Sequence, residues 1–494
     1  MTDSSAEPRN LLLIGGGTMQ LPVIEYAHRL GVKVVCFDGN PQAQARDRAD
    51  WFVVCDIKDR DLCLERARDH QRSHRLDGVV TVGTDFSTTV AWIAGALKLP
   101  GTPYEAALLA KDKGLMRARF SEAGVASPRY QVFTGVPQDP HLEFPFPVVV
   151  KPVDNMGARG VRLVEGWEDL LPALKDAVGF SGTGRAIVEE YIDGPEFSLD
   201  AIVRDGQILR CGIADRTIVF PPAFVEIGHT FPSTASFEVQ EAVWTEFERG
   251  IRALGLTWGA AKGDVKFSST RGPVIGEIAS RLSGGYMSGW TYPLTSGRSA
   301  VLWAVETALG DPLSSQPAEA SLPVAERGWI GLPGRVKSIG GVEAARAVPG
   351  VKEVFLLVQP GRDTHFPRNN VEKLGNVIAV GATAADAEEA TRRARNAVVF
   401  EYEAPHPDTE VFLRGEGPEA WWFPEARGLP DEGPARWLAR GAAGQWRDLY
   451  GNSLGDLVAL LEAEGINTHA QPPRFWRSLL VGGLTGARYA MAAV

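Results

Sequence analysis

Two acidic residues, Asp264 and Glu277, lie on either side of a turn-forming cluster, SSTRGP, that separates two strand-like runs. This pattern predicts a β-hairpin. A turn centred on Thr270 and Arg271 would place the two acids directly opposite each other on one face, where like charges cost up to ~1 kcal/mol. A magnesium ion would neutralise them and keep coordination positions for substrate phosphates. The hairpin therefore predicts a metal site.

The residues around this pair allow a second interpretation. Lys266 and Arg281 could serve as counter-ions on a solvated sheet face, and the hairpin alone does not choose between the two. Arg281 also precedes the pair Gly284 and Gly285, whose amides could approach an anion closely, while the guanidinium offers forked donors to a phosphoryl or carboxylate group. In isolation these residues also fit a surface salt bridge beside an ordinary turn.

The segment FPVVVKPVDNMGARGVRLV carries a third signal. A strand ends at Lys151, a loop contains Gly157 and Gly160, and another strand follows. Such a loop suits a flap over a triphosphate, with its amides and the lysine meeting the charge. The Walker A pattern is absent, and a plain hairpin with a glycine turn is the alternative.

Glu189 and Glu196 stand seven residues apart around a Gly-Pro break in IVEEYIDGPEFSLDAIV. A carboxylate at a strand end can accept from an exocyclic amine, and a second can bind two ribose hydroxyls. An acidic loop without a ligand is the alternative.

The elements that must position these residues predict an α/β and α+β multidomain protein. Short apolar runs alternate with helical stretches over residues 11–99, which predicts a parallel sheet wrapped by helices. Later β-rich runs predict a mixed or antiparallel sheet. The predicted parts are an N-terminal α/β domain (1–103), an α+β domain (104–310) with a glycine-rich lid at about 125–190, a Pro- and Ser-rich linker (311–328), a small α/β module (329–405) and a Trp-rich helical tail (406–494).

The order and spacing of the four signals resemble the ATP-grasp superfamily over roughly residues 10–400. The resemblance implies an N-terminal Rossmann-like (preATP-grasp) domain, an ATP-grasp fold and a C-terminal α/β subdomain. It assigns ATP binding to Lys113, Lys151, Asn155, Gly157, Gly160, Glu189, Tyr191, Ile192 and Glu196. It makes Asp264 and Glu277 ligands of Mg²⁺, with Mn²⁺ as an alternative, and Arg281 the residue that stabilises an acyl phosphate.

Two positions depart from the family pattern. The superfamily often has Glu-Ile-Asn-Pro-Arg at the second metal strand, where this chain has EIASR, so Ala279 replaces the asparagine and one metal position would be held more weakly. Ala158 stands in the glycine-rich loop where Ser is frequent. The number of metal ions is therefore left open.

Within the superfamily, FVEIGHTFPS is similar to the substrate loop of the L-amino acid ligases. That similarity implies that Glu226 and His229 face an amino-acid substrate, and the module after residue 329 resembles the C-terminal subdomain of these enzymes. A lone His in a loop is otherwise more often structural. Gly284, Gly285 and Asp85, at another strand end, are weaker substrate candidates.

A glycine turn, Gly15 to Gly17, followed by Asp38 at the end of the next strand favours a rival class, the NAD-dependent oxidoreductases. The turn lacks the G-x-x-G step of the dinucleotide fingerprint, so the signal is weak. We interpret it as the tight turn of the ATP-grasp N-terminal domain.

Composition limits the partners. The net charge of −10 and pI near 5.5 argue against binding to nucleic acid. The four cysteines lack metal or C-x-x-C spacing, and the polar N-terminus has no signal-peptide core, so we expect a cytoplasmic protein with no membrane contact. A homodimer, common in the family, is left open.

The resemblance implies an ADP-forming ligase that joins small-molecule carboxylate and amine substrates, amino-acid-like ones among them, through an acyl phosphate. The alternatives are other ATP-grasp chemistry, such as carboxyphosphate formation or purine biosynthesis, an NAD-dependent oxidoreductase, or a non-catalytic nucleotide-binding module. The tail at 406–494 could cap the site, mediate dimerisation or simply pack.

Overall fold

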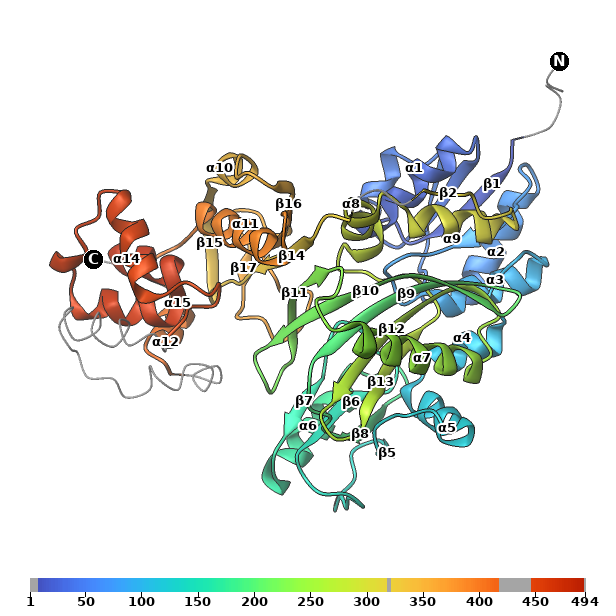
Figure 1. Cartoon of the computed structure of the whole chain (residues 1–494), viewed down its shortest axis with the longest axis horizontal. Helices are drawn as coiled ribbons and strands as arrows, with labels where there is room; N and C mark the ends of the chain where they lie inside the picture. The colour runs from blue at the N-terminus through green and yellow to red at the C-terminus, as the bar shows by residue number, and fades with distance from the viewer. Residues whose placement is uncertain (1–7, 318–320, 417–445, 493–494) are drawn as a thin grey trace. The chain divides into compact units, whose positions relative to one another are not determined.

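The computed structural model of the chain describes residues 8–317, 321–416 and 446–492 (Figure 1). Its contacts divide the chain into two compact units, residues 1–217 with 229–323, and residues 218–228 with 324–494. The chain passes between the units at both ends of the short segment 218–228.

The first unit opens with a parallel sheet of order β3-β2-β1-β4. Its strands are β1 (Asn10–Ile14), β2 (Lys33–Asp38), β3 (Trp51–Val54) and β4 (Gly78–Val80). The runs LLLI and VVCF are fully buried, as expected for a sheet covered on both faces. The predicted parallel sheet is confirmed.

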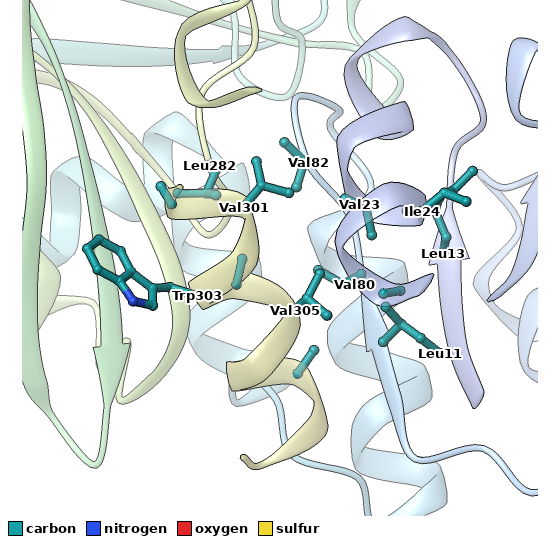
Figure 2. Packing of buried hydrophobic residues seen from close by; sticks show 14 of the residues in the cluster. Leu11, Leu13, Val23, Ile24, Val80, Val82, Leu282, Val301, Trp303 and Val305 are labelled. Carbon is teal, nitrogen blue, oxygen red and sulfur yellow. The ribbon is translucent and has the colours of Figure 1, made fainter. Parts of the chain in front are cut away.

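Alternate residues of β1 enter two different cores. Leu11 and Leu13 pack with α1 (Leu21–Arg29) and α9 (Ala300–Leu309), as Figure 2 shows. Leu12 on the opposite face packs toward α2 (Arg60–Gln71) and α3 (Ser87–Leu97). The helix α9 therefore completes the core of a sheet that lies some 200 residues earlier in the chain.

The predicted lid forms an antiparallel sheet of order β5-β8-β6-β7. Its strands are β5 (Tyr130–Thr134), β6 (Val148–Pro152), β7 (Arg162–Val164) and β8 (Arg185–Glu190), and α6 (Trp167–Phe180) supplies apolar residues to their core. Two helices precede it, α4 (Tyr104–Lys111) and α5 (Lys113–Ala123). A strand, the glycine-rich loop and a second strand follow one another as predicted.

The main antiparallel sheet of the first unit has the order β13-β12-β9-β10. Its strands are β9 (Glu196–Arg204), β10 (Gln207–Val219), β12 (Trp258–Ser268) and β13 (Gly272–Ala279). The helix α7 (Phe237–Ala253) packs on one face, and the face that carries Asp264 looks away from it. β11 (Val225–Phe231) and the short α8 (Tyr292–Ser296) complete this part of the chain.

The small module of the second unit contains two further antiparallel ladders, with helices beside them. β14 (Val324–Trp329) and β16 (Val351–Leu356) flank β18 (Gly375–Val380), while β17 (Asp363–Thr364) and β19 (Val399–Tyr402) flank β15 (Gly334–Gly340). The helices are α10 (Val342–Arg346) and α11 (Ala384–Ala397).

The linker predicted over 311–328 was wrong at its C-terminal end, because β14 begins at Val324. The strand contains two charged residues, Glu326 and Arg327, and these interrupt the apolar pattern that would have predicted it. Both are buried, and the side chain of Asn376 on β18 donates to Glu326.

The tail folds onto the small module of its own unit. Its described helices are α12 (Pro407–Leu413), α14 (Leu454–Ala463) and α15 (Pro473–Ala492), the last broken at Gly483. The guanidinium of Arg395 lies 4.5 Å from the ring centre of Tyr450, and the Tyr489 hydroxyl accepts from the His406 amide at 2.8 Å. Of the predicted roles, packing is the one observed. Three of the tail tryptophans, Trp421, Trp422 and Trp437, lie outside the described residues.

The four cysteines are buried and form no disulfide. Among the described helices, none is both long and apolar enough to cross a bilayer.

Candidate active site

The carboxyl groups of Asp264 and Glu277 occupy directly paired positions on β12 and β13, as predicted. The route to this pairing differs from the prediction. The turn centres on Thr270 alone, because Ser268 pairs with Gly272. This register continues as far as the pair of Val265 with Ile275. A β-bulge at Gly276 then adds one residue to β13 and brings the two acids opposite each other.

Fixed cations surround the acid pair. Arg216 Nη1 lies 3.0 Å from one oxygen of Asp264, and Lys262 pairs with the other. Lys113 Nζ lies 3.5 Å from Glu277 Oε1. Burial raises the pKa of Glu277, but the nearby positive charges, Lys113 first among them, outweigh burial and lower that pKa to about 2. Glu277 is therefore ionised at neutral pH.

The two predicted phosphate lysines come from different elements. Lys113 is the first residue of α5, and Asp112 caps this helix by accepting from the Leu115 amide. The ammonium of Lys113 donates to the Asn155 carbonyl at 2.9 Å. Lys151 projects from β6 and forms an ion pair with Glu189 at 2.6 Å. Both are positioned by a helix start or a strand rather than by a free loop, which fixes their location before any ligand binds.

Glu189, the predicted adenine acceptor, lies inside a buried charge cluster. Its second oxygen accepts from Arg117 Nε at 2.9 Å, and Arg117 is fully buried. Burial raises the pKa of Glu189, but Arg117 and Lys151 together hold it below its usual range. Burial also lowers the pKa of Lys151, an effect that Glu189 partly offsets.

Sequence reasoning missed Arg117. A charged residue inside a helix is normally expected at the surface, unless a buried partner for it is known. Its spacing of four from Lys113 places both on one helix face, which is the signal that could have found it.

The glycine-rich loop turns through three left-handed residues, Gly157, Ala158 and Gly160. Gly160 has no room for a side chain, because a Cβ atom would lie 2.9 Å from the ring of Phe180. Asn155 donates from its side chain to the Phe180 carbonyl at 2.7 Å and so ties the start of the loop to the end of α6.

The predicted hinge follows β8. Ile192 is buried, whereas Tyr191 is exposed with Lys266 Nζ 5.7 Å from its ring centre. Glu196 begins β9 and pairs with Arg216, the same guanidinium that contacts Asp264. Arg216, which sequence reasoning also missed, therefore links the predicted ribose ligand to the predicted metal ligand.

Arg281 lies at the end of β13, buried, with its Nη1 donating to the Leu282 carbonyl at 3.1 Å. Within the part of the chain that the structure describes, its Nε has no hydrogen-bond partner. A buried guanidinium nitrogen with unused donor capacity is suited to an incoming anion.

The turn after Arg281 is held by Asp200, a third residue that sequence reasoning missed. One oxygen of Asp200 accepts from both the amide and the hydroxyl of Ser283, at 2.8 and 2.9 Å. Burial raises the pKa of Asp200 to about 6. Gly284 lies in turn against Gly83 of the N-terminal part, since a Cβ on Gly284 would meet the Gly83 backbone.

Asp85, a weak candidate from sequence, belongs to the same charge field. Burial raises its pKa, while Lys111, Lys113 and Arg281 counteract that rise. The charges of Asp85 and Arg281 therefore act on each other, and the role of Asp85 toward a substrate stays a prediction.

The two predicted amino-acid ligands fall in different units. His229 is 2% exposed, and its Nε2 lies 2.8 Å from the Thr291 hydroxyl. The Glu226 amide donates to Asn370 at 2.8 Å within the other unit. Their roles toward a substrate stay predictions.

The glycine turn of the N-terminal sheet packs against its own loop. Each oxygen of Asp38 accepts one backbone amide, from Gly16 and from Asn40, at 2.7 Å each. A Cβ on Gly16 would lie 3.2 Å from the side chains of Ala43 and Ala45, so the following loop lies against the turn. Asp38 therefore holds the turn and the start of the next loop in place.

A divalent cation fits the acid pair. Magnesium is commonly held by one or two carboxylates together with substrate phosphates, and Asp264 and Glu277 are two ionisable groups on one rigid hairpin. No cluster of three or more His, Cys, Asp or Glu residues that could hold a metal occurs among the described residues. The acid pair therefore fits a metal ion whose remaining ligands come from the phosphates of a bound nucleotide.

Three families match successive parts of the chain. The ATP-grasp N-terminal domain matches residues 24–101, the ATP-grasp domain residues 144–289, and the L-amino acid ligase C-terminal domain 2 residues 329–403. The chain belongs to the ATP-grasp superfamily and is of the L-amino acid ligase type.

Individual proteins are similar to parts of this chain. An uncharacterised protein, y4rH, of Sinorhizobium fredii is 28% identical over 331 residues, which cover 65% of this chain and 68% of that protein. Carnosine synthase 1 of Gallus gallus is 28% identical over 347 residues, 63% of this chain but 36% of its own length. The crystal structure of an L-amino acid ligase from Bacillus licheniformis superposes with a TM-score of 0.71 at 22% identity, over 81% of this chain and all of that one, and so shows a shared fold.

Proposed function

We propose that the chain is an ADP-forming ligase that joins a carboxylate to an amine, with amino-acid-like molecules as substrates. The observation that carries the proposal is the set of cations around the acid pair: Lys113 lies 3.5 Å from Glu277, and Arg216 and Lys262 pair with Asp264. An anionic, metal-binding hairpin inside a ring of cations is what a magnesium triphosphate requires. The L-amino acid ligase C-terminal domain 2 and the relatives named as carnosine synthase and L-amino acid ligase support the substrate class.

In the first step, a carboxylate oxygen of the acid substrate attacks the γ-phosphorus of ATP. The bond between that phosphorus and the oxygen bridging to the β-phosphate breaks, and ADP leaves with an acyl phosphate remaining. Lys113 and Lys151 hold the phosphates in line, and Arg281 stabilises the charge that spreads over the transferred group. The glycine-rich loop excludes water above it.

In the second step, the uncharged amine attacks the acyl carbon, the C–O bond to phosphate breaks, and inorganic phosphate leaves as the nitrogen loses a proton. The product is an amide. Arg281 stabilises the negative charge of the departing phosphate. We assign recognition or deprotonation of the amino group to Glu226, and orientation of a carboxylate or of the transferred phosphate to His229.

Asp264 and Glu277 would hold the magnesium ion, which supplies charge neutralisation on the triphosphate when bound. Glu189 would accept from the adenine amine, with Tyr191 and Ile192 completing the hinge, and Glu196 would bind the ribose hydroxyls. Each of these assignments is part of the proposal.

The test is a screen of amino-acid pairs for ADP and phosphate release, with mass spectrometry of the products. We expect ADP release that depends on both an acid and an amine, and a product lighter by one water than the sum of the two. Asp264→Ala or Glu277→Ala should abolish ADP release, and unchanged turnover in either would overturn the site assignment.

The same screen separates the rival classes. ADP release with bicarbonate but no amino acid would favour carboxyphosphate chemistry, as in the purine-type ligases. Nucleotide binding without any product would favour a non-catalytic module. Absorbance at the nicotinamide band in the purified protein would favour the oxidoreductase.

A further inference from the structure

Lys262 occupies a particular place on the face of the main sheet that carries the acid pair. It lies on β12 two residues before Asp264, so both side chains point to the same face. Its direct partner across β13 is Ala279, and its direct partner across β9 is Asp200. Asp200, Lys262 and Ala279 therefore lie side by side on β9, β12 and β13. On the same face, the neighbouring set of paired residues contains the two proposed metal ligands.

The ammonium of Lys262 is held in the site and does not extend into solvent. It forms an ion pair with Oδ2 of Asp264, and its side chain is 13% exposed. Its charge also acts on Glu277 and on Asp200. One carboxylate on its own strand, one on β9 and one across the hairpin on β13 thus surround a single positive charge.

Asp264 is the only one of the two metal ligands whose oxygens are both paired with protein cations among the described residues. Arg216 lies 3.0 Å from Oδ1, and Lys262 pairs with Oδ2. One divalent ion on Asp264 would displace one of these cations, and a second ion would have to displace both. The neighbouring position on β13, Ala279, offers only a methyl group and no ligand atom.

Phosphoryl-transfer sites need positive charge on both sides of the transferred group, and a second metal ion or a fixed basic side chain can provide it. We propose that the protein binds ATP with a single Mg²⁺, and that Lys262 supplies the second positive charge on the γ-phosphate. The inference rests on the proposed function, because it requires a bound nucleoside triphosphate.

Metal stoichiometry is the first test. Mn²⁺ bound per chain is measured by electron paramagnetic resonance of the free ion, at saturating non-hydrolysable ATP analogue. One Mn²⁺ per complex is expected for the native chain, and two would overturn the inference. The paired substitution Lys262→Ala with Ala279→Asn, which removes the charge and adds a ligand, should raise the number toward two; a number that stays at one would also count against it.

The second test needs no metal and no turnover. Binding of the ATP analogue and of ADP is compared by calorimetry in the presence of a chelator. Lys262→Met should weaken binding of the ATP analogue about tenfold and leave ADP within about twofold, as expected for loss of one charged contact to the γ-phosphate. Lys262→Arg should restore most of the difference.

Lys266→Met is the matched control. Lys266 lies on the same strand and face, two residues beyond Asp264, but its ammonium is 3.6 Å from Glu196, the proposed ribose ligand. Its loss should affect the ATP analogue and ADP alike. An equal effect of Lys262→Met on both nucleotides would mean that Lys262 only supports the sheet, and would overturn the proposal.

The experiments distinguish failure of the proposed function from failure of the role of Lys262. A native chain that binds neither nucleotide, with or without metal, contradicts the proposed function itself. A native chain that binds both nucleotides with two Mn²⁺ ions contradicts only the role of Lys262.

Discussion

Asp264 and Glu277 face each other because one glycine, Gly276, is an extra residue in β13. Without the bulge, Asp264 would pair with Gly276, and Glu277 would turn to the opposite face of the sheet. The bulge is fixed from outside the hairpin, since Arg117 of α5 donates to the Gly276 carbonyl. A buried arginine in the N-terminal half thus sets the register at the proposed metal site.

Inserting one alanine between Gly276 and Glu277 should therefore remove Mn²⁺ binding at the nucleotide site while the rest of the sheet forms. With the bulge kept at Gly276, the inserted residue would pair with Asp264, and Glu277 would move by one position to the other face of the sheet and leave the site. We expect a loss of at least ~100-fold in affinity, comparable to Glu277→Gln. Binding is measured by Mn²⁺ titration, with circular dichroism as the check on folding; a folded insertion variant with native affinity would contradict this account.

Replacing Arg117 by Met should lower the free energy of unfolding by about 3–5 kcal/mol. The buried carboxylate of Glu189 would then lose one of its two cationic partners and keep only Lys151. Urea denaturation measures the change. Arg72→Met is the control, since that side chain is 80% exposed, and it should change stability by less than about 0.5 kcal/mol. A similar small effect for Arg117→Met would show that the buried cluster contributes little.

Asp200 should make the protein less stable as the pH rises. Its pKa is about 6 in the folded chain, because of burial, against 3.8 for a freely solvated aspartate, so the folded state binds the proton more tightly. The stabilisation is complete below about pH 4 and is lost as the pH rises to about 6, an effect of up to ~3 kcal/mol.

The measurement compares native protein with Asp200→Asn at pH 4, 5, 6 and 7. The native chain should lose stability relative to the variant across this range. Asp139→Asn, in an exposed turn, is the control and should show a flat difference. A flat difference for Asp200→Asn would refute the assignment.

Gly160→Ala should impair the glycine-rich loop. The residue has φ near 69°, and an added Cβ would lie 2.9 Å from Phe180, so the loop must shift. We expect a rise in KM for ATP of about tenfold with intact folding. Gly95→Ala, in α3 with no atom within 4 Å of the added carbon, should leave KM unchanged and stabilise the helix by about 0.5–1 kcal/mol.

The sequence predicted the parts of the site that depend on local pattern. Alternating apolar runs predicted the parallel sheet, a turn cluster predicted the hairpin of Asp264 and Glu277, and a strand, a glycine loop and a second strand predicted the lid. In each case neighbouring residues determine the element, so no distant contact had to be known.

The missed residues share another property. Arg117, Asp200 and Arg216 are charged residues inside regular elements, and each is buried or nearly so by partners far along the chain. Asp200, for example, is paired with Ser283, 83 residues away. A charge on a strand or helix is ordinarily exposed, and only the fold reveals the exceptions. The same reason explains the end of the linker, where buried Glu326 and Arg327 lie inside the strand β14.

The helix α9 covers one face of the first sheet, with Val301 and Val305 against Leu11 and Val80 (Figure 2). During synthesis this face stays exposed to solvent until some 220 further residues have left the ribosome. The N-terminal strands therefore depend for their final burial on contacts of very long sequence separation, which slow folding and leave apolar surface open to aggregation or chaperone capture. A fragment ending near residue 103 would retain that exposed face permanently.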